Sequence, residues 1–239
     1  MDIDIKIGII QLSSNDNLKD NCRQLEYYFN QCVEKGANFI LSPEVSNFIS
    51  TDNELRNKTL TNEQEDPMIH LVKKLCKKFT VWCLIGSTVL KIEKDKFVNR
   101  SILINENGRI VSKYDKIHMF DVKISSNEYY KESDSFKPGK KLKSFKFKNT
   151  KIGLTICYDL RFPNLFRKLA KKGSEIILMP AAFTATTGKD HWEILVRARA
   201  IENNAYIIAT NMCGTHHTNR KTYGHSLLVD PWGRVLNRA

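Results

Sequence analysis

The sequence lacks any long hydrophobic run. Although 41% of its 239 residues are hydrophobic, no stretch approaches the roughly 18 apolar residues that a membrane span requires. The start of the chain also lacks the basic residues of a secretory signal, because Asp2 and Asp4 lead directly into a strand-like segment. We therefore predict a cytoplasmic protein that does not associate with a membrane.

Paired cysteines are missing too. The 6 cysteines stand at positions 22, 32, 76, 83, 157 and 213, and no two form a CxxC motif. This scatter favours reduced thiols over a disulfide framework or a zinc site, and most of the cysteines are expected to be small buried groups.

Because no linker rich in Gly, Ser or Pro interrupts the sequence, we predict a single domain over residues 1–239.

The net charge of +12 lacks the concentrated form of a nucleic-acid surface. It comes from 38 basic and 26 acidic residues, and the lysines are spread along the chain in pairs. A nucleic-acid footprint would gather arginines in one tract with interleaved aromatic residues. The pattern favours a solvated face and predicts no nucleic-acid partner. The pairs are Lys73-Lys74, Lys77-Lys78, Lys140-Lys141 and Lys171-Lys172.

An internal repeat organises the chain. The segment Lys6-Ile7-Gly8-Ile9-Ile10 recurs as Lys151-Ile152-Gly153-Leu154-Thr155-Ile156, and both runs are typical of buried strands. Each run is followed by an expected helix, a glycine that ends the helix, a second buried strand and a proline. The expected helices span residues 17–35 and 163–172, and the prolines are Pro43 and Pro180.

The duplicated strand-helix-strand unit predicts the fold class. Two such units imply an α/β protein in which two sheets pack face to face with helices outside. This is a four-layer αββα sandwich with an internal pseudo-two-fold repeat. Further strands are expected at 80–90, 97–104, 109–112, 206–211 and 226–229, with a turn at 105–108 and a helix at 190–203.

Polar residues just after buried strands are the first candidates for chemistry, since ligands of open α/β sheets gather there. Glu44 follows the strand at 38–42, and Cys157 ends the strand at 152–156. Taken singly, each is more often a surface carboxylate or a core thiol. Their matched places in the repeat predict that the two strand ends lie side by side. Glu44 could then take the proton of a thiol whose unperturbed pKa is roughly 8.5.

A cation is expected near such a nucleophile, because it favours the thiolate and stabilises the oxyanion formed by attack on a carbonyl. Lys116 lies in Tyr114-Asp115-Lys116-Ile117-His118-Met119-Phe120-Asp121, directly after an expected strand. This mixture of residues is more typical of a loop that lines a site than of a solvated turn. Loop lysines usually face solvent, so residue type alone leaves the role of Lys116 open.

Three segments resemble the catalytic motifs of the nitrilase superfamily of carbon-nitrogen hydrolases, in the family's order and spacing. They are Pro43-Glu44, Tyr114-Asp115-Lys116-Ile117-His118 and Leu154-Thr155-Ile156-Cys157-Tyr158-Asp159-Leu160-Arg161-Phe162-Pro163. The resemblance runs from Ile5 to the end of the chain. It implies an amidase for small linear amides that works as a homodimer or higher homo-oligomer and needs no cofactor or metal. Glu44 would act as base, Cys157 would form a thioester, and Lys116 with a backbone N–H near Tyr158 would hold the oxyanion.

The resemblance also implies further site residues. Glu132 aligns with a glutamate that positions substrate near the lysine in the family's amidases, although an exposed loop acid is the alternative. Within the Nit branch, the stretch from Cys213 to Gly233 most resembles the amidases for deaminated glutathione, a peptide-like dicarboxylate that needs cationic or amide partners. The remaining candidate contacts are Tyr158, Arg161, Phe183, Thr184, His217 and Arg220.

Other interpretations stay open at this point. One is an ω-amidase acting on α-ketoglutaramate by the same mechanism, and another is an interaction scaffold with a vestigial triad. A papain-like protease is disfavoured because no histidine follows a strand in a matching unit. A metal at His216-His217 is disfavoured because partner ligands at suitable spacing are missing. Family members usually continue beyond Asp230-Pro231-Trp232-Gly233, so we also expect that the usual C-terminal segment is missing.

Overall fold

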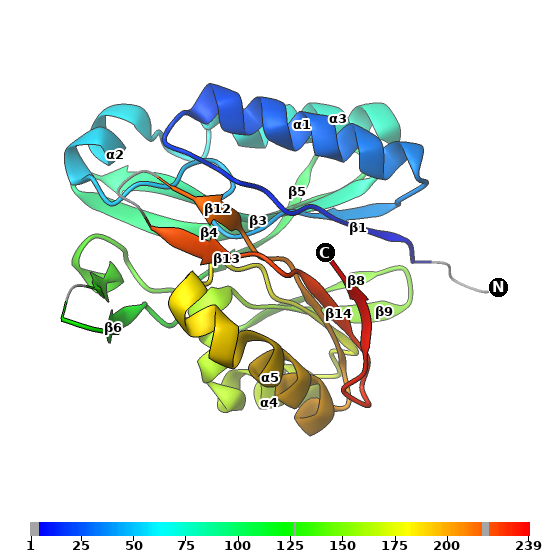
Figure 1. Cartoon of the computed structure of the whole chain (residues 1–239). Coiled ribbons are helices and arrows are strands. Elements are labelled where there is room, and N and C mark those ends of the chain that lie inside the picture. Colours follow the sequence, from blue (N-terminus) through cyan, green and yellow to red (C-terminus); the bar gives the residue numbers. More distant parts are fainter. Residues whose placement is uncertain (1–4, 127, 217–219) are drawn as a thin grey trace.

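Two β-sheets form the centre of the protein, and helices cover their outer faces (Figure 1). The structure is a computed structural model that describes residues 5–126, 128–216 and 220–239. The first sheet has the order β1 (Ile7–Ile9), β2 (Phe39–Leu41), β3 (Trp82–Glu93), β4 (Lys96–Ile104), β5 (Ile110–Asp115). The second has the order β15 (Val235–Arg238), β14 (Leu227–Val229), β11 (Tyr206–Ala209), β10 (Ile176–Leu178), β9 (Thr150–Leu154), β8 (Lys143–Phe147).

The pairing of the strands confirms the internal repeat and extends it. Strands β1, β2 and β3 run parallel, and β4 and β5 continue the sheet antiparallel. Strands β9, β10 and β11 repeat the parallel part, and β14 and β15 repeat the antiparallel part. Strand β8 adds one antiparallel edge to the second sheet. The repeat therefore covers five strands in each half, three more than the sequence pattern revealed.

Four helices complete the predicted αββα layers. Helices α1 (Leu18–Glu34) and α3 (Pro67–Phe79) lie over the first sheet, and α4 (Pro163–Lys171) and α5 (Ala185–Asn203) lie over the second (Figure 1). Helix α5 begins at Ala185, earlier than the expected residue 190, because the Thr184 side chain accepts the Thr187 N–H and caps it. None of the helices within the described residues is both long and apolar enough to cross a membrane.

Helix α3 was not predicted, and neither were several short elements. The short elements include helix α2 (Asn53–Thr59), the 3-10 helices η1 (Glu132–Asp134) and η2 (Cys157–Arg161), and the strand pairs β6 (Asp121–Lys123) with β7 (Tyr129–Lys131) and β12 (Cys213–Thr215) with β13 (Lys221–Tyr223). The β6–β7 hairpin and β12–β13 ribbon extend beyond the two main sheets and border the edge where the candidate site lies (Figure 1).

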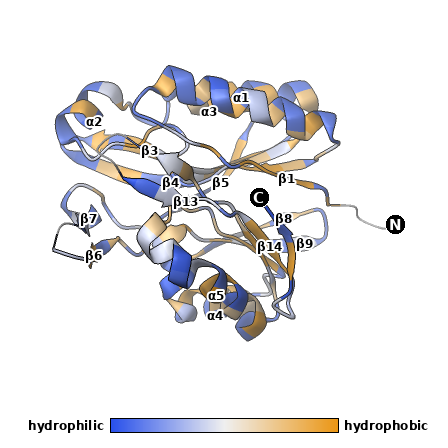
Figure 2. Cartoon of the chain, viewed as in Figure 1, coloured by the Kyte–Doolittle hydropathy of each residue, from blue (hydrophilic) through white to orange (hydrophobic). Residues whose placement is uncertain are grey.

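The core follows from the alternation of side chains along the central strands. In β2, Phe39 and Leu41 point between the sheets, where they join the side chains of the second sheet. Ile40 points the other way and packs beneath α1 and α3 with Leu25 and Val72. Apolar residues accordingly line both sheets and the inner sides of the helices, while polar residues face outwards (Figure 2). Both faces of the central strands are therefore buried.

Candidate active site

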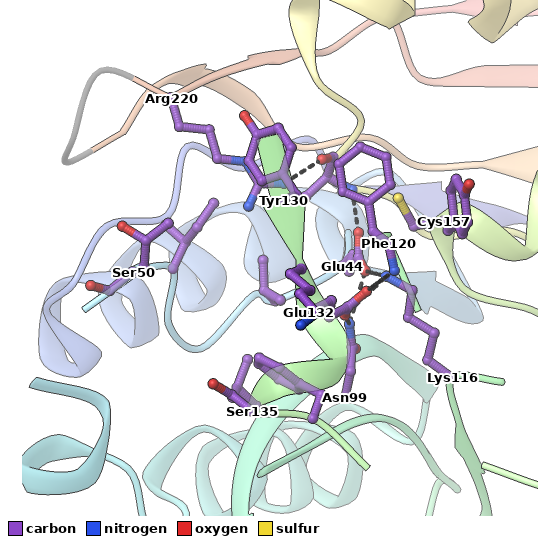
Figure 3. A pocket seen from close by; sticks show the side chains of 18 of the residues that line it. Glu44, Ser50, Asn99, Lys116, Phe120, Tyr130, Glu132, Ser135, Cys157 and Arg220 are labelled. Carbon is purple, nitrogen blue, oxygen red and sulfur yellow. Dashed lines mark hydrogen bonds and ion pairs between the residues drawn. The ribbon is translucent and has the colours of Figure 1, made fainter. Parts of the chain in front are cut away.

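The candidate residues meet at one edge of the sandwich, where a cavity of about 540 Å³ opens (Figure 3). Glu44 follows β2 and Cys157 follows β9, so the two side chains come from different sheets. They do not occupy matched places, because β2 is the second strand of its unit and β9 is the first of its own. The expected side-by-side arrangement is nevertheless present, since both sheets end their parallel strands at this edge.

Cys157 is the first residue of η2 and stands in a strained turn shortly after β9. Its backbone has φ of +44°, in the left-handed region that costs a non-glycine residue about 1–2 kcal/mol. Its N–H donates to the Pro180 carbonyl at 2.8 Å. This hydrogen bond holds the turn against the segment that follows β10. Strain of this kind concentrates where a side chain must be aimed. Tyr158 follows in the first turn of η2, where backbone N–H groups have no partner within the helix.

The Glu44 carboxylate is buried and accepts several hydrogen bonds. Oε1 accepts from Asn99 Nδ2 at 2.8 Å and Lys116 Nζ at 2.9 Å, and Oε2 accepts from the Ala182 N–H at 2.7 Å. Burial by itself would raise the pKa of Glu44. The charge of Lys116 and the hydrogen bonds from Cys157 and Lys116 outweigh burial, so the pKa lies below its ordinary value. Glu44 is therefore an ionised acceptor at neutral pH.

Lys116 lies between two carboxylates. Besides Glu44, its Nζ contacts both oxygens of Glu132 at 2.8 and 3.1 Å, and the Phe120 N–H fixes Glu132 Oε2 at 2.7 Å. Burial opposes the charge of Lys116, but Glu132 and Glu44 outweigh it and raise the pKa of the ammonium. All three donors of the ammonium are therefore directed at carboxylate oxygens, one of Glu44 and two of Glu132.

The Cys157 thiol is uncharged before substrate binds. Burial and the neighbouring Glu44 carboxylate raise its pKa well above the ordinary value, and Lys116 offsets only part of this. The thiol instead lies next to the Glu44 carboxylate, which can accept its proton. Such an arrangement transfers the proton during attack on a substrate and does not maintain a free thiolate.

Asn99 is a site residue that the sequence did not reveal. From strand β4, its Nδ2 donates to Glu44 at 2.8 Å and lies 3.4 Å from Glu132 Oε1, so it links the two carboxylates (Figure 3). Its Oδ1 is buried and has no hydrogen-bond partner among the described residues. A buried asparagine within a strand is unusual, and this rarity is the signal that could have identified it.

A second buried carboxylate holds the turn that carries the thiol. Asp159 Oδ2 accepts from Tyr114 Oη at 2.6 Å and from the Ile156 N–H at 2.9 Å. Its Oδ1 accepts from the His118 N–H at 3.1 Å and lies 2.6 Å from His118 Nδ1. Asp159 thereby ties the segment around Lys116 to the segment around Cys157.

The structure places the other predicted substrate contacts differently. Tyr158, Phe183, Thr184 and Arg220 line the cavity. Arg161 is not among the described residues that line the cavity. Its guanidinium lies 3.0 Å from His191 Nδ1 and over the Phe183 ring. His217 lies outside the described residues. No group of three or more His, Cys, Asp or Glu side chains in the described ranges is arranged to hold a metal ion.

The family model for carbon-nitrogen hydrolases matches residues 6–239. The chain belongs to this family. Among similar proteins, the deaminated glutathione amidase of Yersinia enterocolitica is 37% identical over 97% of this chain and 82% of its own length. The protein of that name from Dictyostelium discoideum is 38% identical with the same coverage, and the human one is 35% identical over 97% of this chain and 72% of its own.

Solved structures agree with the family assignment. The Caenorhabditis elegans NitFhit protein has a TM-score of 0.88 and 32% identity, and the match covers 98% of this chain but only 57% of that one. Nit3 of Saccharomyces cerevisiae, a nitrilase superfamily member, has a TM-score of 0.84 and 29% identity over 98% of this chain and 85% of its own. These findings confirm the nitrilase fold and a hydrolase that acts on carbon-nitrogen bonds.

Proposed function

We propose that this carbon-nitrogen hydrolase cleaves deaminated glutathione to 2-oxoglutarate and Cys-Gly, through a thioester on Cys157. The observation that carries the proposal is the contact of Glu44 with both the Cys157 thiol and Lys116 inside one cavity. The substrate follows from the relatives, since those from a bacterium, an amoeba and human bear the name deaminated glutathione amidase at 35–38% identity.

The first half of the reaction forms the thioester. Glu44 accepts the thiol proton while Cys157 Sγ attacks the amide carbon, which creates a tetrahedral oxyanion. The charge of the Lys116 ammonium and the Tyr158 N–H stabilise this oxyanion. The carbon-nitrogen bond then breaks, and Glu44 returns the proton to the leaving amine. Cys-Gly departs, and the 2-oxoglutaryl group stays on sulfur.

The second half releases the acid. Glu44 is ionised again and takes a proton from a water molecule, whose oxygen attacks the thioester carbon. The same donors stabilise the second oxyanion, and the carbon-sulfur bond breaks with the proton returning to Cys157. Glu132 and Asn99 act by position in this scheme, because they fix Lys116 and Glu44 through the hydrogen bonds described above.

An ω-amidase activity on α-ketoglutaramate is the second candidate. The chemistry is identical, and Arg220 supplies a cation at the cavity that suits the single carboxylate of this substrate. The two activities differ in the leaving group, which is ammonia in one case and a dipeptide in the other.

We further propose a single-domain cytoplasmic protein that assembles as a homodimer. Two exposed isoleucines of α5, Ile194 (68% exposed) and Ile201 (55%), support the assembly. Trp232 is 79% exposed beside Gly233, which packs on Ile201. Exposed apolar groups gathered on one face are typical of a subunit interface.

The test compares wild-type protein with Cys157→Ala on both substrates, measuring 2-oxoglutarate and either Cys-Gly or ammonia. Cys22→Ala is the matched control, because this half-buried cysteine lies on α1 away from the cavity. We expect cleavage of deaminated glutathione that Cys157→Ala abolishes and Cys22→Ala retains. Preference for α-ketoglutaramate would favour the second candidate, and turnover that survives in Cys157→Ala would refute the thioester mechanism.

A further inference from the structure

Arg56 is a buried cation that forms no ion pair with the described residues. It lies on α2, is only 8% exposed, and its guanidinium stands 5.7 Å from the centre of the Phe97 ring and 5.5 Å from that of Phe136. Its Nη2 donates to the Thr51 carbonyl at 2.8 Å, and Nε donates to the Asp52 carbonyl at 3.4 Å. Within the described part of the chain it forms no ion pair, although the charges of Asp52 and Glu132 act on it from a greater distance.

This setting calls for an anion from outside the chain. Burying a charge is costly unless an opposite charge and hydrogen bonds compensate it. The two backbone carbonyls accept from Nε and Nη2, whereas Nη1 has no hydrogen-bond acceptor among the described residues. Arg56 lines the same cavity as the thiol, and so does the neighbouring Ser135, which donates to Asn53 of α2 at 3.0 Å.

A second arginine, Arg220, also lines the cavity. Arg220 Nη2 donates to the Ala182 carbonyl at 3.0 Å, and its guanidinium lies over the Tyr130 ring at 5.3 Å. Its Nε is buried and has no hydrogen-bond partner among the described residues. Figure 3 shows Arg220 and Ser135 on opposite sides of Glu132. The cavity therefore carries two guanidinium groups besides Lys116.

We propose that Arg56 is the subsite for a carboxylate on the leaving-group side of the scissile amide, and so a specificity-determining residue. The inference rests on the proposed function and extends it. The cavity would then select amides with an acid group on each side of the bond that breaks. An arginine fork suits such a group because it can form two parallel hydrogen bonds to a carboxylate.

The contacts of the two arginines assign the ends of the substrate. Arg220 holds the carbonyl of Ala182, whose N–H binds Glu44, so Arg220 is close to the reacting groups and suits the shorter 2-oxoglutaryl chain. Arg56 lies on the part of the cavity wall formed by Phe97 and Phe136, and it suits the longer dipeptide that ends in the glycine carboxylate. α-Ketoglutaramate has no carboxylate on the leaving-group side, because its leaving group is ammonia.

A structural role of Arg56 in holding residues 51 and 52 is the alternative, and a matched pair of substrates separates the two. The pair is deaminated glutathione and its C-terminal amide, which differ only in the charge of the glycine end. Loss of a purely structural arginine lowers kcat/KM for both substrates equally. Loss of a carboxylate subsite lowers it for the acid alone.

The experiment measures kcat/KM for this pair with wild-type protein, Arg56→Gln, Arg56→Lys and the surface control Arg23→Gln. Arg23 is exposed on α1 and pairs only with Asp20, so its replacement removes the same charge away from the cavity. Wild type and Arg23→Gln should prefer the acid by about 10- to 100-fold, the usual range for a hydrogen-bonded charge. The preference should vanish in Arg56→Gln and be partly retained in Arg56→Lys.

Each result decides the matter. Wild-type protein that cleaves both substrates without preference would overturn the inference and leave the proposed function intact, even if Arg56→Gln failed to fold. A preference that persists in Arg56→Gln would also overturn it. Wild-type protein that cleaves neither substrate would refute the proposed function together with the inference.

Discussion

Replacing Lys116 with Met tests the buried charge cluster most directly. Lys116 Nζ lies 2.9 Å from Glu44 Oε1 and 2.8 Å from Glu132 Oε2, and the Lys116 and Glu44 side chains are almost fully buried. The variant leaves two neighbouring carboxylates without their cation. Breaking a buried pair by removing one partner costs about 3–5 kcal/mol. We therefore expect Lys116→Met to lose about that much free energy of unfolding at about pH 8, besides its activity.

The loss should depend on pH with a definite sign. In the wild type, the pKa of Glu44 is lowered, so its contribution to stability is present at neutral pH and is lost only as the pH falls through that pKa. Without Lys116, burial prevails and the pKa of Glu44 rises above its unfolded value. Protonation then relieves the variant, which should recover up to about 1.4 kcal/mol for each pH unit below the new pKa.

Urea unfolding of both proteins between about pH 5 and pH 8 measures this difference. Lys113→Met is the matched control, because Lys113 pairs with Glu63 but is 45% exposed, and exposed pairs contribute about 0–1 kcal/mol. A second control, Lys116→Met with Glu44→Gln, removes both charges and should be less sensitive to pH. A loss for Lys116→Met that is small, or equal at both ends of the pH range, would refute the account of the cluster.

Three further predictions concern the same site. The reactive form needs ionised Glu44 and protonated Cys157, so kcat/KM should fall with midpoints below 4.5 and above 9.0, and a pH profile with a limb between them would contradict this. Asn99→Leu should lower kcat about 10-fold with little effect on KM, which steady-state kinetics would check, since it removes a donor that fixes Glu44. Asp159→Asn should cost about 2–4 kcal/mol in urea unfolding, because it removes acceptors for Tyr114 and the Ile156 N–H.

The sequence predicted the elements that carry strong local patterns. The buried strands before Pro43 and Pro180 were found because their apolar runs repeat along the chain. Helix α3 was missed although its signals are present, since Asp66 and Pro67 form a helix start and Met68, Val72 and Leu75 face inwards at helical spacing. The β6–β7 hairpin has little apolar pattern of its own, so its pairing depends on the surrounding fold.

The site divides in a similar way. Glu44, Lys116 and Cys157 were predicted because each lies in a short sequence motif. The structure brings the three residues together at one cavity. Asn99 and Arg56 lie in segments without a motif, and their placement depends on contacts between distant parts of the chain. Arg161 shows the opposite case. It was a candidate contact because it lies near Cys157 in the sequence, but its guanidinium contacts His191 and is not part of the described cavity lining.

The origin of the reactive groups in two different sheets has a consequence for synthesis on the ribosome. The hydrogen bond from the Ala182 N–H to Glu44 joins residues 138 positions apart. A growing chain contains Glu44 and Lys116 long before Cys157 and Ala182 have been added. A half-made protein therefore has a base without a nucleophile, and catalysis begins only once both sheets have met. Newly made enzyme thus stays inert toward cellular amides until its fold is closed.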